Sequence, residues 1–245
     1  MLAPAEWIEP DWPAPPRVRG LVTTRSGGVS RGPYASLNLG TRVGDDADAV
    51  RENRARLRAA LPSEPRWLHQ VHGTDVVQAN CAELEACADA AFTSTPDVVC
   101  AVQVADCLPV LLCDRAGTSV AAAHAGWRGL SAGVLERAVA AFPGAPKDCI
   151  AWLGPAIGPR KFEVGGDVLA AFTRSDAGAA AAFEPLREGK WLADLYALAR
   201  LRLRLAGVSA VFGGGLCTFA DPQRFFSHRR DRVTGRHAAC IWIAG

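Results

Sequence analysis

The sequence has few lysines, no paired cysteines and no long apolar run, and each shortage argues against a class of protein. Only three of its 27 cationic residues are lysines, and no cationic block accompanies the formal charge of +2, so nucleic acid is not an expected partner. The eight cysteines include no C-x-x-C pair, which disfavours a structural zinc ribbon. No apolar stretch approaches the roughly 20 residues that cross a bilayer, so no membrane partner is expected.

The N-terminal stretch MLAPAEWIEPDWPAPPRVRG lacks the basic start and apolar run of a secretory signal. We therefore expect a soluble, cytoplasmic protein whose cysteines are reduced. A chain of 245 residues, 49% of them apolar, is ample for one large domain. We predict a Pro-rich lead-in over residues 1–20 and a single domain over residues 21–245.

Short apolar runs alternate with helical patterns from residue 21 onward. The helical patterns cover residues 48–61, 131–142 and 191–206, with Ser131 expected to cap the second helix and Gly207 to close the third. Nearly continuous apolar runs, typical of sheets that helices cover, predict strands at 97–105, 108–114, 118–126, 149–154, 208–214 and 238–243. The sequence therefore predicts a layered α/β fold.

One histidine stands at the end of the most apolar of these strands. In SVAAAHAGWRG, residues 119–129, small and apolar residues lead directly to His124, and a glycine follows two positions later. A core histidine satisfied by a single hydrogen bond is the ordinary explanation of such a residue. The preceding strand offers a second explanation.

That second explanation rests on the turn between the two strands. If DRAG, residues 114–117, forms a four-residue hairpin loop, Cys113 faces Thr118 and Cys107 lies directly opposite His124. Opposed residues share a face of the sheet, with Cβ atoms about 4.5 to 5.5 Å apart, which suits a thiolate and an imidazole that hold one zinc ion. Pro109 weakens the argument, because it removes a ladder donor and is compatible with a bulge that shifts the register.

A catalytic zinc site uses three protein ligands and an open position. The third ligand has few candidates, because the chain has only five histidines. His72 is the best placed, since Gly73 follows it where the backbone must turn closely. Spacing alone leaves His69 as an alternative.

Seven motifs, in order along nearly the whole chain from Leu21, resemble the YfiH family, also called laccase-domain or DUF152 proteins. They are TTRSGGVSRGPYASLNLG, VRENRARL, QVHGTDVV, ADCLPVLL, AAAHAGWRG, GPAIGPRKFEVG and FFSHRRDRVTGRHAACIWI. The resemblance implies a single-domain α/β/β/α sandwich with mixed sheets, and a zinc ion held by His72, Cys107 and His124. His228 stands where many relatives have tyrosine and Lys161 where relatives often have cysteine, so we expect neither position to be essential.

The resemblance also implies a zinc-dependent purine nucleoside phosphorylase that acts on adenosine, inosine and methylthioadenosine, with possible adenosine deaminase activity. The partners are then a purine nucleoside and phosphate. Arg25 in the Gly-rich TTRSGG turn suits a phosphate site, although an ordinary glycine hairpin with a solvated arginine explains it equally well. The further candidates for substrate contacts are Ser36, Asn38, Arg128 and Arg229. The H-x-E and P-C-x-x-C signature of known deaminases is absent, so no general acid or base is assigned.

Three other functions are compatible with parts of the sequence. A copper polyphenol oxidase needs several imidazoles beyond a blue-copper centre, which five histidines without an H-x-H pair do not supply. Cys107 as nucleophile with His124 as base predicts a cysteine hydrolase, and the resemblance extends to cysteine or metal-dependent hydrolases that edit peptidoglycan precursors. A binding module with a structural zinc is disfavoured, because such sites usually close with four ligands.

Overall fold

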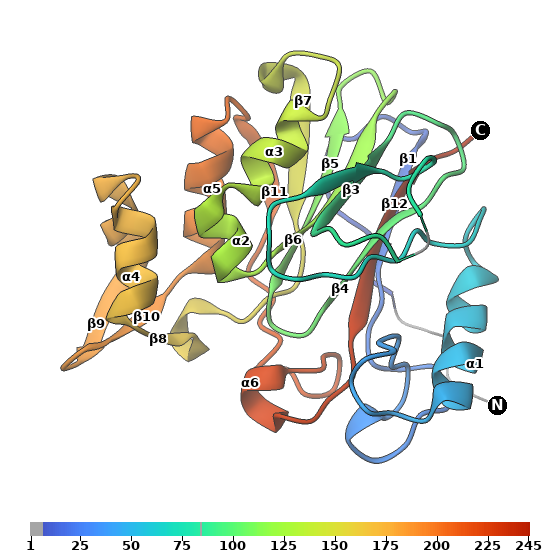
Figure 1. Cartoon of the computed structure of the whole chain (residues 1–245), viewed down its shortest axis with the longest axis horizontal. Coiled ribbons are helices and arrows are strands. Elements are labelled where there is room, and N and C mark those ends of the chain that lie inside the picture. The colour runs from blue at the N-terminus through green and yellow to red at the C-terminus, as the bar shows by residue number, and fades with distance from the viewer. Residues whose placement is uncertain (1–6, 84) are drawn as a thin grey trace.

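The continuous apolar runs of the sequence form the middle of a six-stranded mixed sheet in the computed structural model, which describes residues 7–83 and 85–245 (Figure 1). The sheet has the order β11-β7-β5-β6-β3-β2, with parallel pairs at its two ends and antiparallel pairs between them. Its strands are β2 (Val76–Gln78), β3 (Ala90–Thr93), β5 (Leu108–Asp114), β6 (Val120–Ala125), β7 (Cys149–Leu153) and β11 (Ala210–Gly213). The central strands are buried on both faces, which explains their lack of apolar–polar alternation.

Helices cover one face of this sheet. Leu108, Val110 and Leu112 of β5 point toward that side and share a core cluster with Leu135 and Leu198. The helices on this side are α2 (Trp127–Ala132), α3 (Val134–Ala140), α4 (Gly166–Thr173) and α5 (Leu195–Leu205) (Figure 1). This layer removes the apolar face of the sheet from water.

A second, antiparallel sheet covers the other face, in the order β1-β12-β4. Its strands are β1 (Val18–Val22), β4 (Cys100–Val104) and β12 (His237–Ile243). Leu111 and Ala122 of the large sheet pack with Val102 and Ile241 of the small one. Helix α1 (Ala47–Arg58) covers the outer side of the small sheet, where its Leu57 joins a third cluster. These layers confirm the predicted α/β/β/α sandwich, in which the six-stranded sheet is mixed and the other two sheets are antiparallel.

A short antiparallel sheet extends beside α4, in the order β8-β10-β9 (Figure 1). Its strands are β8 (Glu163–Gly165), β9 (Phe183–Arg187) and β10 (Lys190–Ala193). Helix α6 (His228–Asp231) precedes the last strand, and short 3-10 helices lie at Gly32–Tyr34, Pro146–Asp148, Pro159–Lys161 and Ala177–Ala182. Among the described residues, no helix has both the length and the apolar character that crossing a membrane requires.

Part of the predicted lead-in packs onto the domain. Ile8 and Val22 exchange two backbone hydrogen bonds of 2.8 Å, and Trp12 packs against the cluster between the two sheets. Residues 1–6 of the lead-in lie outside the described residues.

The helix predicted over residues 48–61 is α1, which ends three residues earlier, and the other two predicted helices differ more from the observed ones. The prediction of one helix over residues 131–142 was wrong, because Gly133 adopts φ 105° and separates α2 from α3; Ser131 lies inside α2 and donates to the Arg128 carbonyl. The helix predicted from residue 191 begins at Leu195, because the Asp194 carboxylate caps it by accepting hydrogen bonds from the backbone amides of Tyr196 and Ala197. Trp191 belongs to β10 instead. Gly207, with φ 89°, follows the end of α5 as predicted.

Candidate metal site

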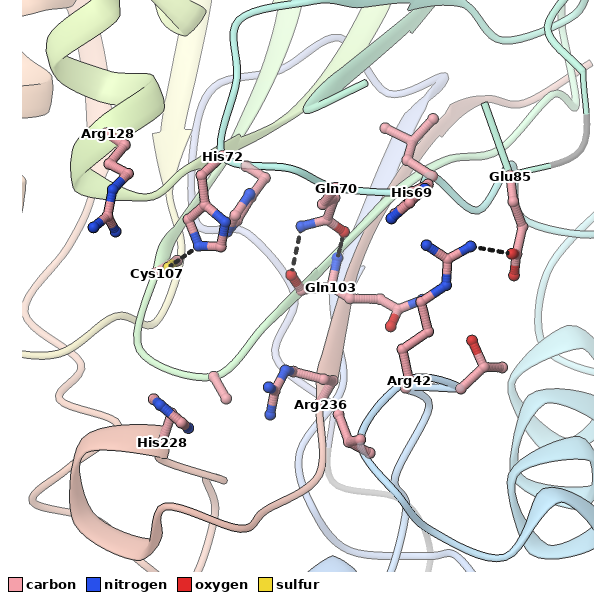
Figure 2. A pocket seen from close by; sticks show the side chains of 16 residues that line it. Arg42, His69, Gln70, His72, Glu85, Gln103, Cys107, Arg128, His228 and Arg236 are labelled. Atoms are coloured by element: carbon pink, nitrogen blue, oxygen red, sulfur yellow. Dashed lines mark hydrogen bonds and ion pairs between the residues drawn. The ribbon is translucent and has the colours of Figure 1, made fainter. Parts of the chain in front are cut away.

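The structure brings together the three side chains that were predicted to bind a metal. Figure 2 shows the side chains of His72 and Cys107 in contact. His124 lies near the end of β6, Cys107 directly before β5, and His72 in the loop before β2. Their ligand atoms all lie within 4.8 Å of one another, and Cys107 Sγ is 3.8 Å from His72 Nε2. His124 is buried while the His72 side is open to solvent, so the group forms the floor of an accessible site.

The predicted hairpin register was wrong by two positions. Cys113 pairs with Val120 and Pro109 faces His124, so Cys107 is not directly opposite the histidine. The Asp114 carboxylate is the reason: it accepts hydrogen bonds from the backbone amides of residues 118 and 119, and Asp114 joins the ladder, leaving residues 115–118 as the loop. A shift of two positions preserves the face of a strand, so Cys107 still points to the side of His124.

The turn after His124 requires a glycine. A Cβ at Gly126 would lie 2.8 Å from His72 Cδ2 and 3.0 Å from Cys107 Sγ. The absence of a side chain at this position therefore allows the histidine and the cysteine to approach each other.

A buried carboxylate that sequence reasoning missed holds both histidines. Asp89 has no exposed surface, and its Oδ1 lies 2.7 Å from His124 Nδ1. The same carboxylate accepts the backbone amides of Val71, His72 and Gly73 at 3.1, 3.0 and 2.6 Å. A carboxylate can only accept here, so His124 Nδ1 carries the proton and Nε2 is left as the ligand atom. The available signal was an aspartate directly before the apolar AAFT run.

The charges of the site stabilise a thiolate. Burial acts to raise the pKa of Cys107, but the charge of His124 and hydrogen bonds from His124 and His72 outweigh it and lower the pKa to about 6. Burial acts to lower the pKa of His124, whereas the Cys107 thiolate and the Asp89 hydrogen bond raise it to about 9. The metal-free pair is therefore a thiolate beside an imidazolium, and the thiolate is the form that binds a metal or attacks a substrate.

A second buried aspartate fixes the backbone next to the cysteine. Asp106 adopts φ 93°, a conformation that a residue with a side chain rarely takes. Its carboxylate accepts hydrogen bonds from Thr218 Oγ1 and from the backbone amide of Arg229, both at 2.6 Å. The C-terminal segment thereby holds the turn that presents Cys107.

A pocket of about 430 Å³ opens above the three side chains (Figure 2). Gln70 crosses its wall, where its amide donates to the Gln103 carbonyl at 2.8 Å and accepts from the Gln103 backbone amide at 2.7 Å. The charged and polar side chains that line the pocket include Arg42, His69, Gln103, Arg128, His228 and Arg236. Most were missed from the sequence, since they come from segments that only the tertiary fold brings together.

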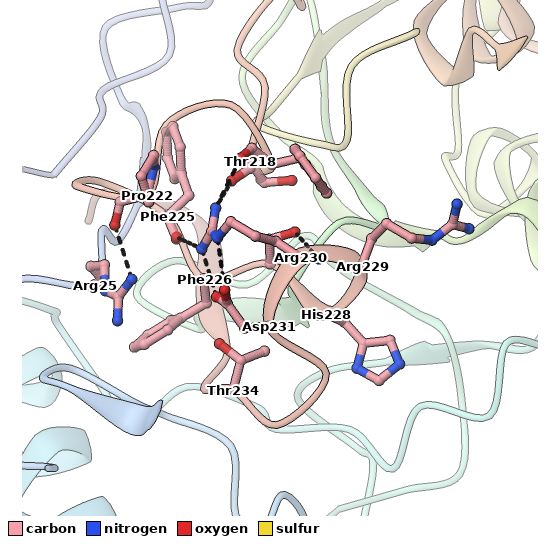
Figure 3. A network of polar contacts seen from close by, with 12 residues as sticks. Arg25, Thr218, Pro222, Phe225, Phe226, His228, Arg229, Arg230, Asp231 and Thr234 are labelled. Carbon is pink, nitrogen blue, oxygen red and sulfur yellow. Dashed lines mark hydrogen bonds and ion pairs between the residues drawn. The ribbon is translucent and has the colours of Figure 1, made fainter. Parts of the chain in front are cut away.

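The predicted phosphate ligand Arg25 lies outside the pocket lining, in the polar network of Figure 3. Its guanidinium donates to the carbonyls of Ala35 and Pro222, both at 2.9 Å, and lies over the Phe226 ring, 4.9 Å from the centroid. Ser36 Oγ accepts from the Gly28 amide and donates to the Arg25 carbonyl. These bonds organise the glycine-rich turn, and a phosphate contact at Arg25 or Ser36 stays a prediction.

The other predicted substrate contacts divide in the same way. Asn38 is fully buried, and its Oδ1 accepts from the amides of Gly40 and Arg236. The Arg229 guanidinium donates to the Glu163 carbonyl at 2.7 Å. Of the five residues predicted to contact substrate, Arg128 alone lines the pocket. The roles of Asn38, Arg128 and Arg229 in binding stay predictions.

The segment that carries His228 is held by Arg230 (Figure 3). Its Nε and Nη2 atoms donate to Asp231 at 2.8 and 2.7 Å. The remaining donors reach the carbonyls of Thr218, Phe219 and Phe225 at 2.8 to 3.1 Å. All five N–H groups of this guanidinium are therefore used within the protein, which leaves Arg230 no donor for a ligand.

The fold and the site together define a layered α/β protein with a candidate His–Cys–His metal centre. Residues 19–244 match the model of a family described as multi-copper polyphenol oxidoreductase laccase. The solved structures that resemble the chain include a DUF152 protein of Neisseria meningitidis, with a TM-score of 0.94, 53% identity and coverage of 98% of this chain and 99% of that one. YlmD of Geobacillus stearothermophilus has a TM-score of 0.93 at 32% identity, over 100% of this chain and 98% of its own.

Curated relatives are similar over almost their whole length. A protein of Pseudomonas aeruginosa named purine nucleoside phosphorylase is 56% identical over 97% of this chain and 98% of its own. YfiH of Escherichia coli, also named purine nucleoside phosphorylase, is 57% identical over 96% of this chain and 98% of its own. The chain belongs to the YfiH/DUF152 family, as its motifs predicted.

Proposed function

We propose that this protein is a zinc-dependent purine nucleoside phosphorylase that acts on adenosine, inosine and methylthioadenosine, with adenosine deamination as a second activity. The observation that carries the proposal is the group of His72, Cys107 and His124 at the floor of an open pocket. The names of relatives at 56 and 57% identity support the reaction and the substrate class.

The donor set fits zinc. Two imidazole nitrogens and one thiolate are ligands that zinc accepts, and three protein ligands with an open position are typical of a catalytic site. Asp89 orients His124 through a hydrogen bond to Nδ1, as carboxylates that bind a histidine ligand do in zinc enzymes. A zinc ion held there would supply a Lewis acid at the floor of the pocket.

The donor set fits a multicopper oxidase less well. Among the described residues, His72, Cys107 and His124 form the one group with metal-binding geometry. Another histidine, His237, is buried against Phe226 and outside the pocket. An oxygen-reducing copper cluster needs several further imidazoles in one place.

Phosphorolysis requires the pocket to hold a nucleoside and phosphate at once. A phosphate oxygen forms a bond to C1′ of the ribose, the bond from C1′ to the purine nitrogen breaks, and the purine leaves with the electron pair and gains a proton. The products are ribose 1-phosphate and the free base. The Gln103 amide and His69 offer donors and acceptors for a purine edge on the wall of the pocket.

The test is to incubate zinc-loaded protein with each nucleoside, with and without phosphate, and to identify the products by chromatography. Phosphate-dependent formation of ribose 1-phosphate is expected, and hypoxanthine or inosine from adenosine would report deamination. His124→Ala, purified and treated with zinc in the same way, is the control for a contaminating enzyme. No turnover of any nucleoside under any metal loading would refute the proposal.

A cysteine hydrolase acting on peptidoglycan precursors is the second candidate. The observation that favours it is the buried Asp89–His124 hydrogen bond beside the Cys107 thiolate, an arrangement of acid, base and nucleophile. Alkylation distinguishes the two functions, with the exposed Cys81 and Cys87 as reference thiols. If added zinc protects Cys107 from alkylation and restores the nucleoside turnover of chelated protein, the phosphorylase is supported. If hydrolysis of a peptidoglycan precursor survives chelation and is lost on alkylation, the hydrolase is supported.

A further inference from the structure

The pocket above the metal site has an excess of positive charge. Three arginines line it and Glu85 is its one carboxylate. That carboxylate is already engaged, because Arg42 Nη2 lies 3.0 Å from Glu85 Oε2 at the rim. Arg128 and Arg236 are thus left in the pocket without a carboxylate partner among the described residues. Such a pocket suits an anionic ligand.

Arg236 is the arginine that the protein holds in a fixed position. Its Nη1 donates to the carbonyls of Thr234 and Gly235 at 3.1 and 3.0 Å, and its backbone amide donates to Asn38 Oδ1 at 2.8 Å. A Cβ at Gly40 would lie 2.8 Å from Arg236 Cγ, so the chain leaves room for this side chain. The Nε and Nη2 donors have no hydrogen-bond partner among the described residues, which leaves one edge of the guanidinium for a ligand.

Arg236 also lies close to the metal-binding cysteine. Burial lowers the pKa of its guanidinium, while Cys107 and Asp106 act in the opposite direction, so these groups are within electrostatic reach. Figure 2 shows the guanidinium pointing into the part of the pocket between Cys107 and His228. An anion bound to this edge of the guanidinium would lie beside Cys107 and the candidate metal site.

His228 adds an acceptor on the other side of that space. Its Nδ1 lies 2.8 Å from the Arg232 carbonyl, which can only accept, so Nδ1 is the donor, and in this tautomer Nε2 is an acceptor. Hydrogen phosphate carries oxygens that accept from a guanidinium and one P–OH that donates to such a nitrogen. Sulfate has acceptor oxygens only.

We propose that Arg236 and His228 form the subsite for inorganic phosphate in the pocket beside Cys107, in place of the sequence-predicted Arg25. This gives His228 a role in ligand preference that its departure from the family motif did not predict. This inference rests on the proposed phosphorylase function, because it names the position of the second substrate. Arg128, whose guanidinium lies over the Trp127 ring at 4.4 Å, is more exposed than Arg236 and is not assigned to the subsite.

The first test measures binding of inorganic phosphate to zinc-loaded protein by calorimetry, without any nucleoside. Arg236→Gln should weaken phosphate binding at least tenfold, because it removes a charged, two-donor edge. Arg42→Gln removes the same charge from the rim and should change phosphate affinity less than threefold. Equal losses in the two variants, or no loss in Arg236→Gln, would overturn the inference. Circular dichroism and zinc content show whether each variant is folded and loaded.

The second test uses kinetics and separates this inference from the proposed function. Arg236→Lys should raise KM for phosphate about tenfold or more and leave KM for inosine within threefold, because lysine keeps the charge but lacks the planar fork. If Arg25→Lys has this effect and Arg236→Lys does not, the subsite is wrong while the phosphorylase function stands. If the wild-type protein binds phosphate through Arg236 but cleaves no nucleoside, the function fails and the anion site stands.

Two ligands test the chemistry of the site. Wild-type protein should bind phosphate more tightly than sulfate, and His228→Phe should remove that preference; equal wild-type affinities would exclude the acceptor role of His228. Adenosine 5′-monophosphate serves as the second probe. If the affinity for adenosine 5′-monophosphate depends on Arg236 while the affinity for inorganic phosphate does not, the free edge of the guanidinium binds a nucleotide phosphate. The assignment of Arg236 to the subsite for inorganic phosphate is then refuted.

Discussion

Replacing Asp89 by asparagine tests whether the buried carboxylate organises the metal site. Oδ1 accepts from His124 Nδ1 and the His72 amide, and Oδ2 accepts from the Val71 and Gly73 amides. Asparagine keeps one acceptor oxygen and turns the other into an NH₂ donor. In either orientation, two of the four donors face another donor. At about 1 to 3 kcal/mol for each buried unsatisfied group, the free energy of unfolding should fall by about 2 to 6 kcal/mol.

Zinc binding should weaken together with stability. Loss of a carboxylate that orients a histidine ligand typically reduces metal affinity 10- to 100-fold, or about 1.4 to 2.8 kcal/mol. Competition with a chromophoric chelator measures the affinity, and urea unfolding measures the stability. Asp75→Asn is the control, because Asp75 is an exposed carboxylate on the loop that carries His72 and does not contact His124. A folded Asp89→Asn protein that binds zinc within twofold of the wild type would refute the role of Asp89.

Three further predictions concern the site and the core. Replacing any one of the three metal-site residues by alanine should abolish zinc retention and turnover while circular dichroism stays unchanged, because the core does not depend on the metal; unfolding with zinc retained would contradict this. Gly126→Ala should reduce turnover on the order of 10- to 100-fold by displacing His72 and Cys107, whereas Gly144→Ala, where a Cβ meets no atom within 4 Å, should be silent in the same assay. Burial lowers the pKa of His237 from 6.5 to about 3, so between these values the unfolded chain binds a proton that the folded one does not. The stability that the neutral His237 ring contributes should therefore be fully present above pH 6.5 and decline by about 1.4 kcal/mol per pH unit between pH 6.5 and about 3, as urea unfolding at several pH values would show; a flat profile would exclude a buried neutral ring.

The layers of the fold could be predicted from the sequence, because a strand buried on both faces is a continuous run of apolar residues. Residues 108–113 read as an uninterrupted apolar run, and β5 covers the predicted residues 108–114. Helix boundaries were less accessible, because a helical pattern of apolar residues does not show at which residue a glycine interrupts the helix or a capping carboxylate starts it. Gly133 divided one predicted helix, and Asp194 delayed the start of another.

The sequence by itself determined the three candidate ligands. Apolar strands and a short turn place Cys107 and His124 on one face, and the family motif adds His72. The tertiary structure decided the register, because Asp114 bonds to the loop and moves the pairing by two positions without changing the face. It also decided what surrounds the ligands. Asp89 contacts His124 because β3 pairs with β6. Arg236 lines the pocket from a position directly before the last strand, more than a hundred residues after His124 in the sequence. No spacing in the sequence records such contacts, because they depend on how separate layers pack.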